Sequence, residues 1–100
     1  MSAPDPAFDA VHPSGHILFR SCRGGYLHSV LLGAEALHTE AASLAEAILR
    51  AADVSHLKAL LQVRAEIVAA GHTPSAEVPT AHDLSAAIAA LLDHRLTEPR

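Results

Sequence analysis

Two short stretches of this chain alternate between apolar and polar side chains, which is the pattern of half-buried β-strands. They span residues 16–22 and 26–32, and the pair Gly24-Gly25 lies between them. A two-residue type I′ turn requires positive φ angles at both central residues, and glycine adopts such angles without steric cost. The pattern therefore predicts a β-hairpin with Gly24 and Gly25 at the centre of its turn.

This turn sets the register of the predicted hairpin. It pairs Arg23 with Tyr26, Phe19 with Val30, and Ile17 with Leu32. The face formed by the last two pairs is uniformly apolar, and we expect a helix to cover it. The opposite face is too apolar to be ordinary solvent surface; it carries Leu18, Arg20, Leu27, Ser29 and Leu31. Because an isolated hairpin is only marginally stable, a third strand is expected, either from residues 7–12 or from another chain.

A long apolar segment without glycine or proline follows, and it predicts one helix that ends near Ala70. The helix begins at Thr39, or at Ser43, which has the capping-box spacing to Glu46, and Gly71 suits the position after the last turn. The apolar side chains change face midway: first Leu44, Ala47, Ile48 and Ala51, then Leu57, Leu60, Leu61, Ile67 and Val68. Either the helix breaks at residues 53–55, or it continues and packs against two different surfaces. We favour the continuous helix.

Residues 72–79 form a linker with two prolines, and a shorter helix is expected at residues 80–96. Thr80 and Asp83 again have the spacing of a capping motif. The apolar stripe of this helix consists of Leu84, Ile88, Leu91 and Leu92. Together these patterns predict a single α+β domain over residues 1–100 with its core at residues 11–71. A small antiparallel sheet, made of the hairpin and an edge strand, packs on the long helix.

Composition narrows the class of protein. The chain has 100 residues, 50% of them hydrophobic and only 3% aromatic, so its core is small. A net charge of −4 argues against a nucleic-acid binder, which usually carries a basic excess. Cys22 is the single cysteine, which excludes an intrachain disulfide. The sequence shows neither a signal peptide nor a membrane span. We expect a cytoplasmic protein, or one exported by a route that needs no signal peptide.

The eight histidines are many for this length, yet they form no metal-binding motif. His12 and His16 lie near Cys22 and His28 in the hairpin, but a metal site needs three or four converging ligands. In the predicted register, Cys22 and His28 point to opposite faces. A cysteine nucleophile would also need a histidine partner held by a third group, and none is evident. We therefore expect no metal, no cofactor and no enzymatic activity.

Four basic side chains are candidates for phosphate contacts if the protein binds DNA: Arg20, Arg23, Arg50 and Lys58. Acidic residues share the long helix with them, so a mixed, solvated surface is the simpler interpretation. Arg64 differs because it lies within the second apolar stripe. It would need a carboxylate partner, for which Asp83 and Asp93 are candidates, or it would extend its charged end into solvent.

Residues 12–52 resemble the core of the small actinobacterial type VII secretion-associated proteins of the EspD/EspH kind, which are similar in turn to the YbaB/EbfC fold. The resemblance is carried by Ile17 and Phe19, Gly24-Gly25, Val30 and Leu32, then Leu44, Ala45 and Ile48. With the C-terminal helix it covers about residues 11–95. The resemblance implies a YbaB-like dimer, a role as substrate, chaperone or accessory protein of the secretion machinery, and no catalytic residues.

The sequence thus predicts a homodimeric, non-enzymatic protein-interaction module, accessory or chaperone-like in type VII secretion. Its partners would be secretion components or substrates. A YbaB-like nucleoid-associated DNA-binding protein is the alternative. Self-association is expected because the helix changes its apolar face, the outer sheet face is apolar and the core is small. The candidate interface residues are Leu18, Leu27 and Leu31, or Leu57, Leu61 and Val68.

Overall fold

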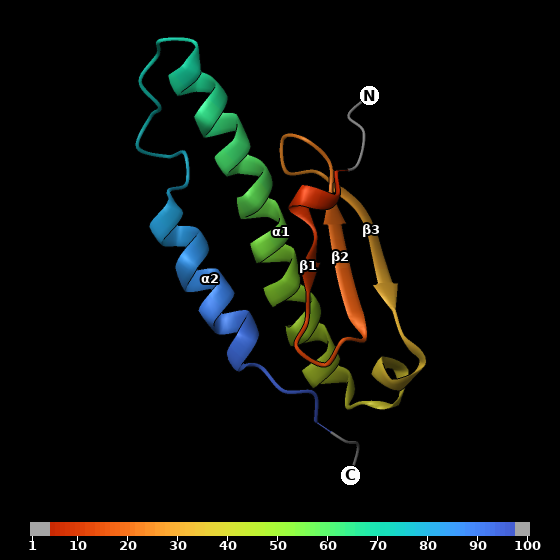
Figure 1. Cartoon of the computed structure of the whole chain (residues 1–100). Helices are drawn as coiled ribbons and strands as arrows, with labels where there is room; N and C mark the ends of the chain where they lie inside the picture. Colours follow the sequence, from red (N-terminus) through yellow and green to blue (C-terminus); the bar gives the residue numbers. More distant parts are fainter. Residues whose placement is uncertain (1–4, 98–100) are drawn as a thin grey trace.

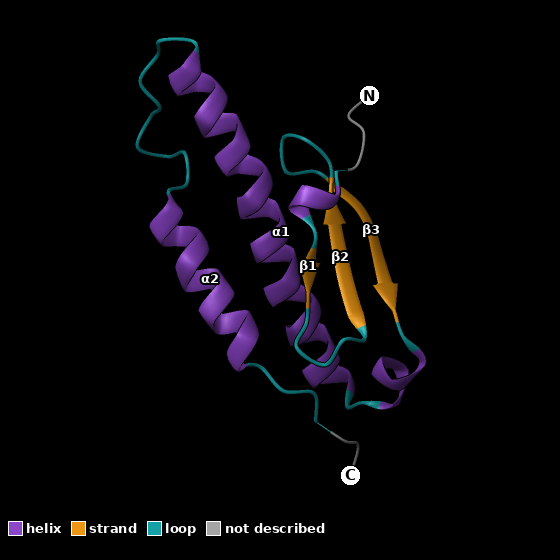
Figure 2. Cartoon of the chain, in the orientation of Figure 1, coloured by secondary structure: helices purple, strands orange, loops and turns teal. Residues whose placement is uncertain are grey.

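The computed structural model describes residues 5–97 and has the predicted α+β architecture (Figures 1 and 2). In chain order the elements are the 3₁₀ helix η1 (Pro6–Phe8), β1 (Ala10–Val11), β2 (Ile17–Ser21), β3 (Leu27–Leu32), the 3₁₀ helix η2 (Ala34–His38), α1 (Ala41–Ala69) and α2 (Ala81–Asp93). The molecule is elongated, with extents of 54 × 27 × 16 Å. Neither α1 nor α2 is long and apolar enough to cross a bilayer.

The three strands form one antiparallel sheet in the order β1-β2-β3. The predicted hairpin register is confirmed over most of its length, because Phe19 pairs with Val30 and Ile17 pairs with Leu32. The expected third strand also comes from residues 7–12, since Ala10 pairs with Phe19. The chain therefore supplies its own edge strand beside β2.

The predicted turn is wrong by one residue. Cys22 donates its N–H to the carbonyl of Tyr26 at 2.7 Å, and Gly25 donates to the carbonyl of Cys22 at 3.0 Å. The turn therefore spans residues 22–25, with Arg23 and Gly24 at its centre, and Arg23 does not pair with Tyr26. A bulge between Arg20 and Ser21 absorbs the extra residue, so that Leu27 pairs with Ser21.

Helix α1 explains why Gly25 is needed beyond the turn itself. Both Gly24 and Gly25 have φ near +88°. In addition, the ring of His56 on α1 hydrogen-bonds the carbonyl of Gly25, with Nδ1 at 2.9 Å from the oxygen. A Cβ at Gly25 would lie only 2.5 Å from that nitrogen. The close approach of α1 to the turn therefore also favours glycine at position 25. No local sequence pattern encodes this contact.

Helix α1 is continuous through residues 53–55, as predicted. At its C-terminus Gly71 adopts a φ of +86°, and its N–H and that of His72 bond the carbonyls of Val68 and Ile67. The predicted capping box at Ser43 is not formed, because α1 begins at Ala41 and Ser43 lies inside it. Ser43 is buried, and it bonds the C-terminal segment of the chain instead.

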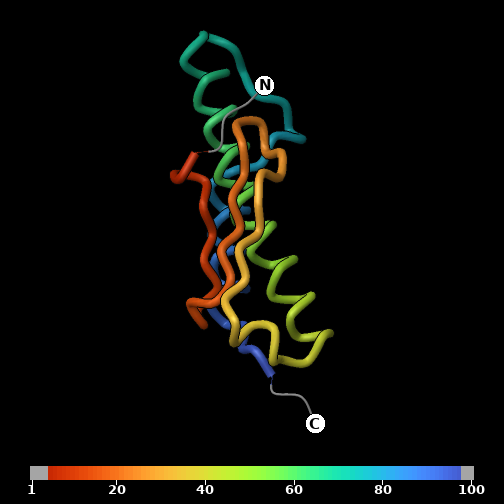
Figure 3. Tube along the Cα trace, turned by 90° about the vertical axis from the view of Figure 1, so that its right-hand side faces the viewer, coloured from red at the N-terminus to blue at the C-terminus, as the bar shows by residue number. Residues whose placement is uncertain are grey.

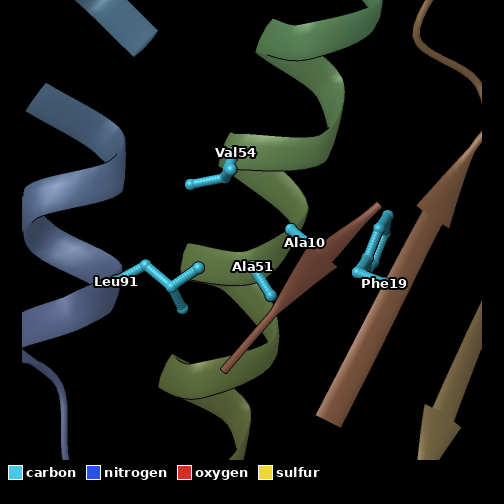
Figure 4. Close-up of a cluster of buried hydrophobic side chains, with 5 residues drawn as sticks. All are labelled: Ala10, Phe19, Ala51, Val54 and Leu91. Carbon is cyan, nitrogen blue, oxygen red and sulfur yellow. The ribbon is translucent and has the colours of Figure 1, made fainter. Parts of the chain in front are cut away.

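The core forms where α1 lies between the sheet and α2 (Figure 1). Figure 4 shows this cluster, in which Phe19 of β2 and Leu91 of α2 approach α1 from different sides. The α1 positions between them are small; Ala47, Ala51 and Ala59 are fully buried. Small side chains let neighbouring elements approach α1 closely. Phe19 of β2 and Leu91 of α2 therefore meet α1 over the same stretch, at Ala51 and Val54.

Helix α2 begins with the predicted capping box. The Thr80 N–H and the Thr80 hydroxyl both donate to Oδ2 of Asp83, at 2.8 and 3.1 Å. The hydrogen bonds from the Thr80 backbone and hydroxyl lower the pKa of Asp83 below its usual value. The helix ends at Asp93 rather than at residue 96, because residues 94–97 turn across the start of α1.

Candidate interaction surface

Within residues 5–97, no element covers one face of the sheet. Side chains alternate along each strand, so Ala10, Ile17 and Phe19 face α1 and are buried. Val11, Leu18 and Leu31 form a row across the opposite face through the pairs Val11–Leu18 and Leu18–Leu31. Figure 3 views the sheet from this side, with α2 behind it and the first half of α1 to one side of it. We call the row Val11, Leu18 and Leu31 the outer row.

The outer row is accessible to a partner. Val11 is 50% exposed and Leu31 is 59% exposed, while Leu18 between them is half-buried. Beside the row, β3 has a neighbouring strand on one side only among the described residues. An edge strand presents unpaired N–H and C=O groups that can pair with another strand. The surface therefore combines apolar side chains with an open backbone edge.

The two alternative sets of predicted interface residues lie on different elements, one on the sheet and one on α1. Leu18 and Leu31 come together in the outer row, and Leu27, 59% exposed, lies nearby on β3. Leu57 and Leu61 are half-buried on α1, and Val68 is exposed near the end of that helix. Val11 was not among the interface residues predicted from the sequence. Its pairing with Leu18 is the signal that identifies it.

All four proposed phosphate ligands are bonded within the chain. The Arg20 guanidinium donates two hydrogen bonds of 2.7 Å to the Asp9 carboxylate, and Lys58 Nζ donates to the Asp9 carbonyl at 2.8 Å. The hydrogen bonds from Arg20, aided by the nearby charges of Arg20 and Lys58, hold the pKa of Asp9 below its usual value. These contacts tie Asp9, the residue before β1, to both β2 and α1.

The other two predicted ligands also have acidic partners. Arg23 at the hairpin turn pairs with Glu66 of α1, and Arg50 pairs with Glu46 one helical turn away. Arg64 donates to the carbonyl of Val78 at 3.1 Å, a backbone contact that is neither of the two alternatives considered for it, a carboxylate partner at Asp83 or Asp93 or extension into solvent. Arg23 and Arg64 thus each join α1 to a loop, whereas Arg50 and Glu46 pair within α1.

The histidines near the hairpin separate in space. His16 Nε2 lies 2.9 Å from a carboxylate oxygen of Glu35, His28 bonds Ser29, and Cys22 is buried as a free thiol. Within residues 5–97, no three His, Cys, Asp or Glu side chains are placed to hold a metal ion. The group considered from the sequence, His12, His16, Cys22 and His28, therefore does not form a metal site within these residues.

His12 makes a contact that the sequence analysis did not anticipate. Its side chain is buried, and Nε2 lies 2.9 Å from Nδ1 of His94, 82 positions away along the chain. Nδ1 of His12 accepts the backbone N–H of Ser14 at 3.0 Å. Burial, reinforced by the nearby His94 and Arg95, lowers the pKa of His12 below its usual value. No sequence periodicity relates two residues so far apart.

The described residues thus define a small α+β protein whose sheet has one uncovered face and an unpaired edge at β3. This chain belongs to a family of proteins of unknown function, DUF2694, which matches residues 1–97. It is 69% identical over 96 residues to an uncharacterized protein of Mycobacterium bovis and to uncharacterized proteins of two strains of Mycobacterium tuberculosis. Each match covers 96% of this chain and 95% of the relative. No solved structure matches the chain.

Proposed function

We propose that this protein is a non-enzymatic protein-interaction module that forms a homodimer through its sheet. The observation that carries the proposal is the outer row, in which Val11 is 50% and Leu31 is 59% exposed, with Leu31 on the edge strand β3. Two copies of an edge strand can pair antiparallel about a two-fold axis, because such an interface is self-complementary. The paired edges would extend the sheet and bring the two outer rows side by side.

The role of this module would be accessory or chaperone-like in type VII secretion, with secretion components or substrates as further partners. Support for this role comes from the resemblance to small actinobacterial secretion-associated proteins, together with the mycobacterial source of the relatives. A nucleoid-associated role has less support. Its four candidate phosphate ligands are already bonded to groups of the same chain, and the net charge is −4.

Sedimentation equilibrium tests the dimer. We expect the mass of two chains at micromolar concentration, and we expect Leu31→Glu to weaken association at least about tenfold, because it places a charge in the apolar contact. Leu49→Glu is the matched control, since Leu49 is 68% exposed on α1, which covers the other face of the sheet. A mass of one chain that does not change on concentration would contradict the proposal.

Capture of partners from mycobacterial cytosol tests the secretion role. The wild-type protein and Leu49→Glu should retain the same secretion component, whereas Leu31→Glu should lose it if the outer row also binds the partner. A DNA-shift assay at several salt concentrations separates the nucleoid role, because phosphate-driven binding weakens steeply with salt. Salt-sensitive DNA binding that Arg20 or Lys58 substitutions abolish would favour the nucleoid role over the secretion role.

A further inference from the structure

Residues 94–97 follow α2 as an irregular segment that crosses the start of α1 (Figure 1). The segment is extended at His94, with φ −77° and ψ 139°. Its next side chains alternate in exposure, because Arg95 and Thr97 are exposed whereas Leu96 is half-buried. Such alternation is typical of an extended peptide that lies against a surface.

Leu96 anchors the segment in an apolar pocket. It packs against the buried cluster of Ile17 from β2, Ala36 from η2 and Ala47 from α1. Each of these three residues is at most 1% exposed, so the pocket lies where the sheet, η2 and α1 meet. Because two of the three are alanines, a side chain as large as leucine fits between the three elements.

Hydrogen bonds hold the backbone of the segment. The Ser43 hydroxyl accepts the N–H of Thr97 at 3.0 Å and donates to the carbonyl of Arg95 at 3.3 Å. The N–H of Glu40, the residue before α1, donates to the carbonyl of Thr97 at 2.8 Å. The Arg95 side chain instead bonds two carbonyls at the end of α2. We call Glu40, Ser43 and the pocket of Leu96 the α1 groove.

The α1 groove therefore contacts backbone groups and one apolar side chain. Backbone hydrogen bonds give affinity and a side-chain pocket gives specificity when a protein binds an extended peptide. The side chains on either side of the anchor point away, so a foreign segment can make the same contacts. We propose that the α1 groove binds an extended segment of a partner protein with a leucine at its centre. Residues 95–97 are the intramolecular competitor that this partner displaces.

A cleft beside Leu96 supplies what a partner gains over the chain's own segment. Its volume is about 540 Å³, and it is lined by Ser14, His16, Glu35, His38, Thr39 and Leu96. The imidazole, carboxylate and hydroxyl groups of this lining can bond polar groups next to the leucine of a partner. Exchange of residues 94–97 between two copies of this chain would only replace each contact by an identical one, while association itself costs free energy.

The α1 groove is separate from the outer row. Ile17 faces α1, whereas Leu18 and Leu31 lie on the opposite face of the sheet. This second site rests on the proposed protein-interaction role but not on the proposed dimer. Binding at the groove and association through the sheet can therefore be measured separately.

An NMR titration of the ¹⁵N-labelled full chain tests the groove. The probe is an acetylated and amidated peptide with the sequence of residues 94–98. Leu96→Asp removes the anchor of the chain's own segment, so this variant should bind the peptide about tenfold or more tightly than the wild type, in which the segment must first leave. The amides of Glu40 and Ser43 should shift on binding, and that of Val68 at the other end of α1 should not.

Controls in the protein and in the peptide define the mode of recognition. Leu92→Asp makes the same change at a position that is 56% exposed on α2, so this variant should bind as the wild type does. A peptide with Leu96→Asp should not bind. A peptide with alanine in place of both Arg95 and Thr97 should bind about as tightly as the original, because the groove contacts only the backbone at these positions.

Three results would overturn the proposal: no shift of Glu40 or Ser43 in the folded Leu96→Asp variant, equal affinity in wild type and Leu96→Asp, or loss of binding by the alanine peptide. If circular dichroism shows that Leu96→Asp does not fold, Leu96→Ala replaces it, since it shortens the anchor without adding a charge.

Sedimentation equilibrium distinguishes this site from the dimer. The mass of Leu96→Asp should equal that of the wild type. A dimer that is lost in this variant alone would assign the groove to the segment of a second copy and overturn the proposal. A single-chain mass in both samples, with peptide binding intact, would support the groove and contradict only the dimer.

Discussion

The hydroxyl groups of Ser21 and Ser55 lie 2.6 Å apart in the buried contact between β2 and α1. Each is at most 1% exposed, so neither hydroxyl can bond water if its partner is removed. We expect Ser55→Ala to cost about 1–3 kcal/mol, because the Ser21 hydroxyl is left unsatisfied. The double variant Ser21→Ala/Ser55→Ala should cost less than the sum of the two single variants, since it removes both groups. Urea unfolding measures all three, with Ser85→Ala on the exposed side of α2 as control. Strict additivity would show that the two hydroxyls do not depend on each other.

The two faces of β2 should differ in their sensitivity to truncation. Phe19 is 8% exposed and packs in the central cluster, so Phe19→Ala should cost about 3–5 kcal/mol through lost burial and a cavity. Leu18 on the outer face is half-buried, and Leu18→Ala should cost less in the free energy of unfolding of the monomer. Urea unfolding compares the two variants, at protein concentrations low enough for the chain to be monomeric. Equally small losses would contradict the observed register.

Acid should weaken the attachment of β1 through Asp9. The pKa of Asp9 is held below its ordinary value of 3.8 by the hydrogen bonds from Arg20. Below about pH 3.8 the unfolded chain takes up a proton at this position and the native protein does not, so stability falls as the pH drops toward the native pKa. Asp9→Asn should be less stable than wild type at neutral pH, and it should lose less stability below pH 3.8. Unfolding curves at several pH values test this, with the exposed Asp53→Asn as control. A pH dependence of Asp9→Asn parallel to wild type would rule out this contribution.

Two glycines with nearly the same φ should respond differently to alanine. Gly71 has φ +86°, and a Cβ at this position would meet only open space, so Gly71→Ala should cost only the backbone strain of about 1–2 kcal/mol. Gly25 has φ +88°, and a Cβ there would meet the ring of His56, which bonds the Gly25 carbonyl. Gly25→Ala should therefore cost about 1 kcal/mol more than Gly71→Ala. Thermal unfolding monitored by circular dichroism compares them. Equal losses would mean that His56 moves aside freely.

Features governed by local physics could be predicted from the sequence. The alternation of apolar side chains led to the pairing of Phe19 with Val30, because a shift of one residue would exchange the two faces of β2. The absence of glycine and proline led to the continuous helix α1, and Thr80 and Asp83 led to the start of α2. Each of these signals acts within a few residues, where backbone geometry relates spacing to direction. The apolar character of the outer sheet face could be predicted in the same way.

The tertiary structure decided the contacts between segments far apart in the chain. The turn moved by one residue where His56 of α1 meets Gly25, and Ser43 became a hydrogen-bond partner of the C-terminal segment instead of a helix cap. Val11 joined the outer row only because β1 pairs with β2. His12 and His94 meet across 82 positions. Hydrogen bonds of this kind depend on the distance and orientation of two side chains after packing. Sequence by itself therefore determined the elements and their apolar faces, whereas packing determined which polar groups meet.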